Sequence, residues 1–264
     1  MVKKLLKHEL IALFRVLVFL MAAVVIFAVL GRIMLSASLN NESETGALLT
    51  ILLIMFYIFA IFALVFTAWG LGVSRFYKSL FTGEGYMTFS LPATPMQLVT
   101  AKLLSSIIAM AAATVVSVLS ATIFMMGWEA SVIEMLTDAF SELAELLRMA
   151  IEAEPLLILE WIISLIVSIP MSMLVVYSII SVGQLFTSHR KGMTWVIAFA
   201  TYFVASILNT LVINPAFTAI TESVGGTAGM HLGVWLEIIL NAAIDVGCFF
   251  LIRYILRNKV NLIA

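Results

Sequence analysis

Charged residues are scarce in this chain of 264 residues. Asp, Glu, Lys and Arg together make up 11% of it, against about 25% in ordinary soluble domains. Apolar residues make up 63%, and a water-soluble domain of this length would need a more charged surface. The deficit excludes an ordinary soluble globule and indicates that lipid covers most of the chain. A formal net charge of -1 gives no electrostatic support for nucleic-acid binding.

Cysteine and histidine are also scarce. A single cysteine, Cys248, excludes an intrachain disulfide and a cysteine-based metal site. The histidines His8, His189 and His231 are far apart in the sequence, which argues against a zinc site. The sequence has no G-x-x-x-x-G-K-[ST] phosphate loop, no G-x-S-x-G and no H-E-x-x-H. We therefore expect neither catalytic activity nor a bound cofactor in this chain alone.

Long uncharged stretches are abundant instead. Four of them exceed the roughly 20 residues that cross a bilayer core, namely 45–74, 103–128, 161–188 and 192–221. Two further apolar stretches contain isolated charges: 16–39 and 232–256. No alternating pattern of about ten residues suggests a β-barrel. The sequence therefore predicts an all-α membrane protein with six transmembrane helices.

We predict a single six-helix domain over 16–264, preceded by an amphipathic helix over 1–15. Cations and leucines fall on different faces of that first helix, which favours a position at the membrane surface over a simple basic anchor. The predicted spans and connections are 16–39, 47–73, a loop over 74–99, 100–127, an amphipathic segment over 128–155, 156–186, 192–214 and 232–256. The acidic segment 128–155 either covers the helix ends or meets a cationic substrate.

The charges also predict an orientation. Alternating the six spans places 12 of the 14 cations on one side and ten acids on the other. By the positive-inside rule the basic side is cytoplasmic, so both termini are cytoplasmic. A cleaved signal peptide is disfavoured, because the apolar run before the small residues Ser36-Ala37-Ser38 is too long for one.

The loop over 74–99 is unusual because it combines aromatic residues, methionines and glycines with few charges. An exposed apolar loop of this kind suggests a docking surface; the alternative is that it packs on its own helices. Thr94 has the character of an N-cap, with Pro95 at the first helical position and Gln97 at the third. This pattern predicts that a helix starts here and continues into the third span.

The same region carries a family resemblance. The residues that carry it are Glu84-Gly85-Tyr86-Met87-Thr88, Leu91-Pro92, Gln97, Ala101-Lys102 and, after the last span, Val260-Asn261-Leu262. In this order the chain resembles the permease subunits of ABC-2 type transporters, ATP-driven exporters of the bacterial plasma membrane. The resemblance implies a separate ABC ATPase subunit that binds ATP and Mg²⁺, and a second permease copy or paralogue.

The resemblance further implies that 75–85 forms a coupling segment that docks on the ATPase. The implied coupling residues are Arg75, Phe76, Tyr77, Lys78, Phe81, Thr82, Glu84, Gly85 and Tyr86. Non-transporting alternatives stay open, among them an interaction or immunity protein whose acidic outer helix binds a cationic peptide. A third alternative is an ion-coupled secondary transporter, although no internal inverted repeat is visible.

Polar residues inside the spans are candidates for a translocation path. Glu237, Asn241 and Asp245 recur every four residues and so share one helix face. A carboxylate at mid-span, such as Asp245, is costly and suggests a functional role, the alternative being a structural polar cluster. Arg32, in the first span, is the predicted partner of Glu237.

Pro170 and several small residues concern helix packing. Pro170 is predicted to kink the fourth span, with Ser168 or Ser172 satisfying the freed backbone groups. Small residues every fourth position predict close helix contacts. They are Ala109, Ala113, Ser117 and Ala121 in the third span and Ser164, Ser168 and Ser172 in the fourth.

Overall fold

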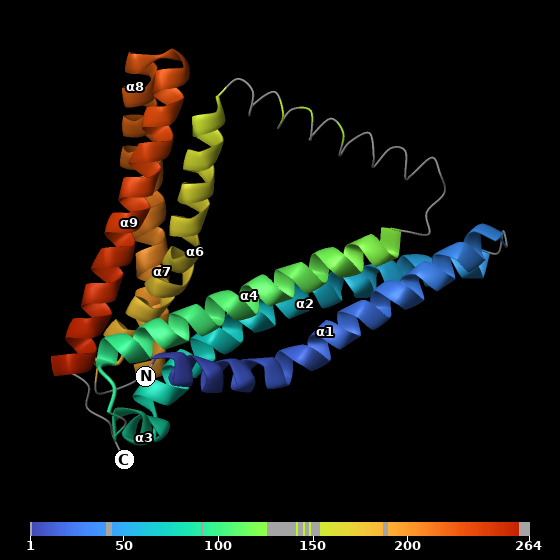
Figure 1. Cartoon of the computed structure of the whole chain (residues 1–264), viewed down its shortest axis with the longest axis horizontal. Helices are drawn as coiled ribbons and strands as arrows, with labels where there is room; N and C mark the ends of the chain where they lie inside the picture. Colours follow the sequence, from blue (N-terminus) through green and yellow to red (C-terminus); the bar gives the residue numbers. More distant parts are fainter. Residues whose placement is uncertain are drawn as a thin grey trace. The chain divides into compact units, whose positions relative to one another are not determined.

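The computed structural model describes residues 2–40, 44–90, 92–125, 141, 145, 148, 154–186 and 190–258. Every regular element in this part of the chain is a helix (Figure 1). The elements are α1 Val2–Asn40, α2 Glu44–Phe81, α3 Glu84–Ser90, α4 Pro95–Met125, α6 Pro155–Gly183, α7 Arg190–Leu208, the π-helix η1 Asn209–Ile213, α8 Asn214–Val224 and α9 Gly226–Asn258. The all-α prediction is confirmed.

Six helical segments within the described residues are long and apolar enough to cross a membrane. They are Val2–Met34, Leu48–Phe81, Pro95–Phe124, Pro155–Gly183, Gly192–Val224 and Gly226–Asn258. The prediction of six helices able to span a membrane is confirmed, and these helices indicate a multi-pass membrane protein. Most of the predicted amphipathic segment over 128–155, and Val260-Asn261-Leu262, lie outside the described residues.

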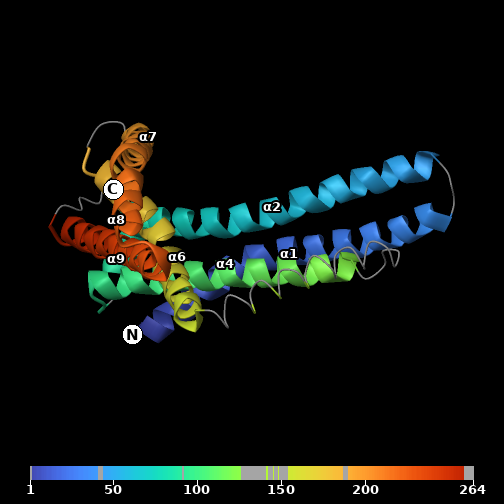
Figure 2. The same ribbon diagram turned by 90° about the horizontal axis from the view of Figure 1, so that it is seen from above.

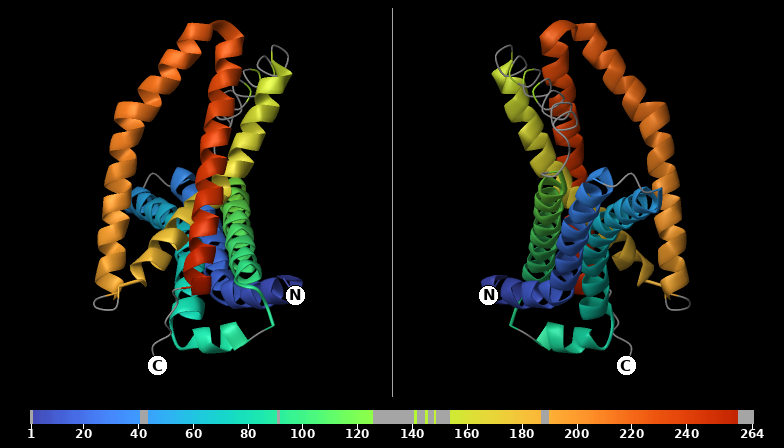
Figure 3. Two further views of the ribbon diagram at one scale, coloured as in Figure 1. Left: turned by 90° about the vertical axis from the view of Figure 1, so that its left-hand side faces the viewer. Right: turned by 90° about the vertical axis from the view of Figure 1, so that its right-hand side faces the viewer.

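The first helix differs from its predicted boundaries. α1 continues without a break through the predicted boundary between 15 and 16. Figure 3 shows its dark blue N-terminal turns running at a steep angle to the rest of the helix. A position of these turns at the membrane surface stays a prediction.

The predicted loop over 74–99 is mostly helical. α2 continues to Phe81 and stops before Gly83, a residue that weakens helices, and α3 follows. The predicted start of the next helix is confirmed, because α4 begins at Pro95. The backbone N–H of Gln97 donates to Thr94 Oγ1 at 3.3 Å, and the N–H of Thr94 donates to Gln97 Oε1 at 3.2 Å. This reciprocal pair is a capping box.

Contacts divide the chain into two units, and each is described by itself. Unit 1 comprises 1–72 and 104–147, and unit 2 comprises 73–103 and 148–264. The boundaries fall within α2 and within α4. The prediction of a single domain over 16–264 stays a prediction.

Unit 1 contains α1 and most of α2 and α4, which run lengthwise beside one another (Figures 1 and 2). The ring of Tyr57 stacks on Phe124 with centroids 5.1 Å apart, and its hydroxyl lies 3.0 Å from Ser120 Oγ. Ala109 and Ala113 are fully buried in the same apolar cluster. The predicted packing role of these two small residues is confirmed.

Unit 2 is organised by α6 and α9, which pack against each other along their length. The ring of Phe76, at the end of α2, stacks on Tyr177 of α6 with centroids 3.9 Å apart. α8 turns into α9 at Gly225 and Gly226, where φ is 67° and 58°, values that favour glycine. From this turn α8 and α7 (orange) diverge from α9 (red) (Figure 3).

Candidate functional site

A partly open cavity of about 670 Å³ with mixed polar and apolar walls lies in unit 2, bordered by α6, α7, η1, α8 and α9. Its polar lining residues are Tyr202, Ser206, Asn209, Asn214, Glu237 and Asn241. The remaining lining is mainly apolar and includes Met171, Phe217, Leu240 and Ile244. This combination and this volume are typical of small-molecule sites. All of these residues belong to candidate membrane spans.

The π-helix η1 brings two asparagines to the cavity. The backbone N–H of Asn214 donates to the carbonyl of Asn209, which is the i to i+5 bond of a π-helix. Residues five apart share one side of such a turn, whereas in an α-helix they lie about 140° apart. π-turns are frequent at functional sites. The sequence analysis did not select Asn209 or Asn214, although two asparagines within the uncharged stretch 192–221 could have indicated a polar site.

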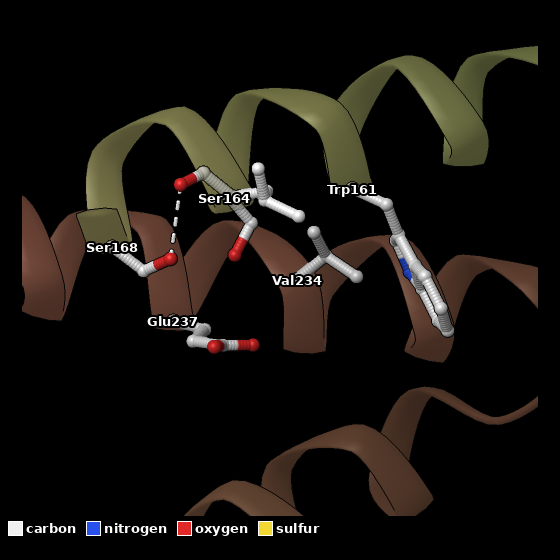
Figure 4. A pocket seen from close by; sticks show the side chains of 6 residues that line it. Trp161, Ser164, Ser168, Val234 and Glu237 are labelled. Carbon is white, nitrogen blue, oxygen red and sulfur yellow. Dashed lines mark hydrogen bonds between the residues drawn. The ribbon is translucent and has the colours of Figure 1, made fainter. Parts of the chain in front are cut away.

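Glu237 lines this cavity and also a second one, of about 300 Å³, between α6 and α9. Figure 4 shows Ser164 and Ser168 of α6 on one side of the second cavity and Val234 and Glu237 of α9 on the other. Within the described part of the chain, the Glu237 carboxylate makes no hydrogen bond or ion pair. The predicted packing serines of α6 therefore border a space beside a carboxylate.

The three polar residues predicted on α9 separate in the structure. Asn241 is buried and lines the larger cavity with Glu237. Asp245 lines neither cavity, and its Oδ1 is buried without a hydrogen-bond partner among the described residues. Arg32 belongs to unit 1 and Glu237 to unit 2, so their pairing stays a prediction. The candidate site therefore centres on Glu237 and Asn241.

A hydrogen-bonded cluster that sequence reasoning missed joins α6 to α9. His231 Nδ1 lies 2.7 Å from Glu160 Oε2, and its Nε2 lies 3.5 Å from Glu154 Oε2. Trp235 Nε1 donates to Glu160 Oε1 at 2.8 Å. The usable signals were Glu160, the single charge of α6, and the i, i+4 spacing of His231 and Trp235. Only a doubly protonated imidazole can donate to both carboxylates at once.

This cluster is expected to fasten the first turns of α6 and α9 rather than to bind metal. Among the described residues, no group of His, Cys, Asp and Glu can hold a metal ion. The two ring nitrogens of His231 face different carboxylates, so the donors do not converge on one point. The cluster lies next in sequence to Trp161 and Val234, which line the smaller cavity, and is expected to support that wall.

We expect Glu160→Ala to lower the melting temperature of the detergent-solubilised protein by several degrees. The substitution removes the acceptor of both His231 and Trp235, and donors that lose their partner destabilise a fold. The matched control is Glu222→Ala, which removes an exposed acid from the end of α8 and should leave the melting temperature unchanged. Equal shifts in the two variants would contradict a fastening role.

The predicted coupling residues divide into a buried and an exposed group. Phe76, Phe81 and Gly85 are buried, and Phe76 contacts both Tyr177 and Phe81. Arg75, Tyr77 and Thr82 are partly exposed, whereas Lys78, Glu84 and Tyr86 are exposed. Phe76, Phe81 and Gly85 are covered by this chain itself, so a partner can contact only the six other members.

Pro170 lies inside α6, which continues through it. The hydroxyls of Ser168 and Ser172 donate to the carbonyls of Leu165 and Ile169 at 3.0 and 3.1 Å. Neither of these bonds reaches Ile166, whose carbonyl is the one that Pro170 leaves without its usual donor. The predicted kink stays a prediction, and these two serine bonds do not compensate for the proline.

No family model, no curated protein and no solved structure matches this chain at a significant level.

Proposed function

We propose that the chain is the membrane-spanning permease subunit of an ATP-driven ABC-2 type exporter in a bacterial plasma membrane. The observation that carries the proposal is the group of polar residues in the wall of the larger cavity, all of them in candidate spans. Lipid tails cannot satisfy amides and a carboxylate, so polar groups within membrane spans normally face a wet cavity or a ligand. A cavity with Glu237, Asn241, Asn209 and Asn214 in its wall is therefore suited to a translocation path.

A second permease copy or paralogue completes the path in this proposal. Among the side chains of α7 and η1 that the structure describes, none is buried. These two helices nevertheless supply Tyr202, Ser206 and Asn209 to the cavity. Polar groups on a span with so little cover need a further protein surface to exclude lipid from them. A symmetric or pseudo-symmetric pair of permeases supplies such a surface.

The exposed coupling residues receive the ATPase in this proposal. Lys78, Glu84 and Tyr86 lie on the end of α2 and on α3, which face the cytoplasm if the positive-inside orientation holds. Phe76 stacks on Tyr177 and so ties this end of α2 to α6. α6 in turn contributes to the walls of both cavities. Movement of the docked ATPase would thereby be transmitted from α2 to α6 by the stacked rings of Phe76 and Tyr177, and so to the cavity walls.

Co-purification tests the proposal. A tagged copy extracted from its native host with detergent is expected to carry a stoichiometric ATPase that has a phosphate loop. The double variant Lys78→Glu, Tyr86→Ala should reduce the recovered ATPase by about tenfold or more, because aromatic and charged contacts dominate interface energies. Glu222→Gln, which removes an exposed charge elsewhere, should recover it fully. Reproducible absence of an ATPase would reject the exporter.

A further inference from the structure

We propose that the two cavities around Glu237 bind an amphiphilic organic cation, whose charged centre sits at the Glu237 carboxylate. The idea that such a cation is the exported substrate rests on the proposed function. The idea that the cavities bind such a cation rests on the residues of this chain alone. Among the described residues, Glu237 is the single one that lines both cavities, and no Lys, Arg or His lines either cavity.

The first argument is electrostatic. The Glu237 side chain is exposed in the chain alone and has no ion-pair or hydrogen-bond partner within the described residues, and it belongs to a candidate span. A carboxylate in a membrane span with no partner in the protein is expensive unless a cation or water meets it. Because the lining carries one negative charge and no positive one, the site favours cations and rejects anions.

The second argument concerns the kind of cation. The smaller cavity is lined by Glu237 at one end and by the indole of Trp161 at the other (Figure 4), and an indole face attracts organic ammonium and similar cations. A metal ion would need several oxygen ligands, and no described group of His, Cys, Asp and Glu can hold one. The site therefore suits a diffuse organic charge rather than a metal ion.

The third argument concerns the body of the ligand. The larger cavity adds apolar walls from Leu240, Ile244 and Phe217 to the amides of Asn209 and Asn214. Its volume of about 670 Å³ falls within the range of drug-sized ligand sites, which is roughly 300–1,000 Å³. A ligand with an apolar body and a few polar groups uses both kinds of wall.

The test measures binding of tetraphenylphosphonium to the purified full-length chain by equilibrium dialysis, with empty detergent micelles as the background. Tetraphenylborate, an anion of nearly the same size and shape, is the control ligand. We expect saturable binding of the cation and none of the anion. Glu237→Gln should weaken cation binding by about tenfold or more, and Trp161→Leu by about two- to fivefold. Glu222→Gln removes a charge outside both cavities and should bind normally.

Two outcomes would overturn the inference: equal affinity of Glu237→Gln and the unaltered chain, or saturable binding of tetraphenylborate. If Glu237→Gln does not fold, thermal melting of the unaltered chain decides, because the cation must raise the melting temperature and the anion must not. Cation binding without a co-purified ATPase would keep this site and reject the exporter. A co-purified ATPase without cation binding would reject this site alone.

Discussion

Phe76→Ala is expected to destabilise the protein by about 3–5 kcal/mol, the cost of truncating a large aromatic side chain in a packed core. The ring of Phe76 is completely buried and stacks on Tyr177 at 3.9 Å with an interplanar angle of 2°. It also packs against the ring of Phe81 in a T-shaped arrangement, with the centroids 5.9 Å apart. The truncation would leave a cavity between the end of α2 and α6 and would remove the stacking energy.

Denaturation of the detergent-solubilised protein, followed by circular dichroism or tryptophan fluorescence, measures this effect. The matched control is Phe66→Ala on the same helix, because the Phe66 side chain is 68% exposed and its loss should cost well under 1 kcal/mol. If the Phe76→Ala variant were as stable as the Phe66→Ala variant but recovered no ATPase, Phe76 would be a contact with the ATPase and not a core residue. The experiment thus separates a core role from a partner contact.

Gly229→Ala is expected to cost about 1–3 kcal/mol through overpacking and to deform the wall of the larger cavity. A Cβ at Gly229 would lie 2.5 Å from the backbone oxygen of Thr221 and 3.4 Å from its carbonyl carbon. That oxygen also accepts the N–H of Gly225 at 2.9 Å in the turn between α8 and α9. Backbone held in this way can yield only if α8 moves away from α9.

Gly247→Ala on the same helix is the matched control, because a Cβ there meets nothing within 4 Å. It should leave stability unchanged or raise it by up to about 1 kcal/mol, since alanine is the better helix former. Thermal melting measures both variants, and tetraphenylphosphonium dialysis reports on the cavity, which Phe217 of α8 helps to line. Equal melting temperatures for the two variants would contradict the close approach of α8 and α9.

Local patterns predicted the helices well. The six spans follow from uninterrupted apolar runs, because backbone polar groups in lipid must be satisfied within the segment. The start of α4 follows from Thr94 and Gln97, because a capping box involves only residues three apart. Composition misled in 74–99, where aromatic residues suggested an exposed surface but Phe76 and Phe81 are buried.

Residues that meet across helices could not be predicted in the same way. Asp245 was favoured because it is charged and lies at mid-span, yet Glu237 is the carboxylate that lines the cavities. Glu160 and His231 are 71 residues apart, and no local pattern relates them. Asn209 and Asn214 share a side because η1 widens the helix there, a change that helical periodicity does not anticipate.

By itself, the sequence indicated a lipid environment and determined the number of apolar helices and the start of α4. Each of these depends on hydrophobicity or on hydrogen bonds between near neighbours in the chain. Tertiary structure alone decided which polar groups face a cavity, which aromatic rings are buried and which acid meets His231. These outcomes depend on how α6, α7, α8 and α9 are packed, and packing is set by side chains that are distant in the sequence.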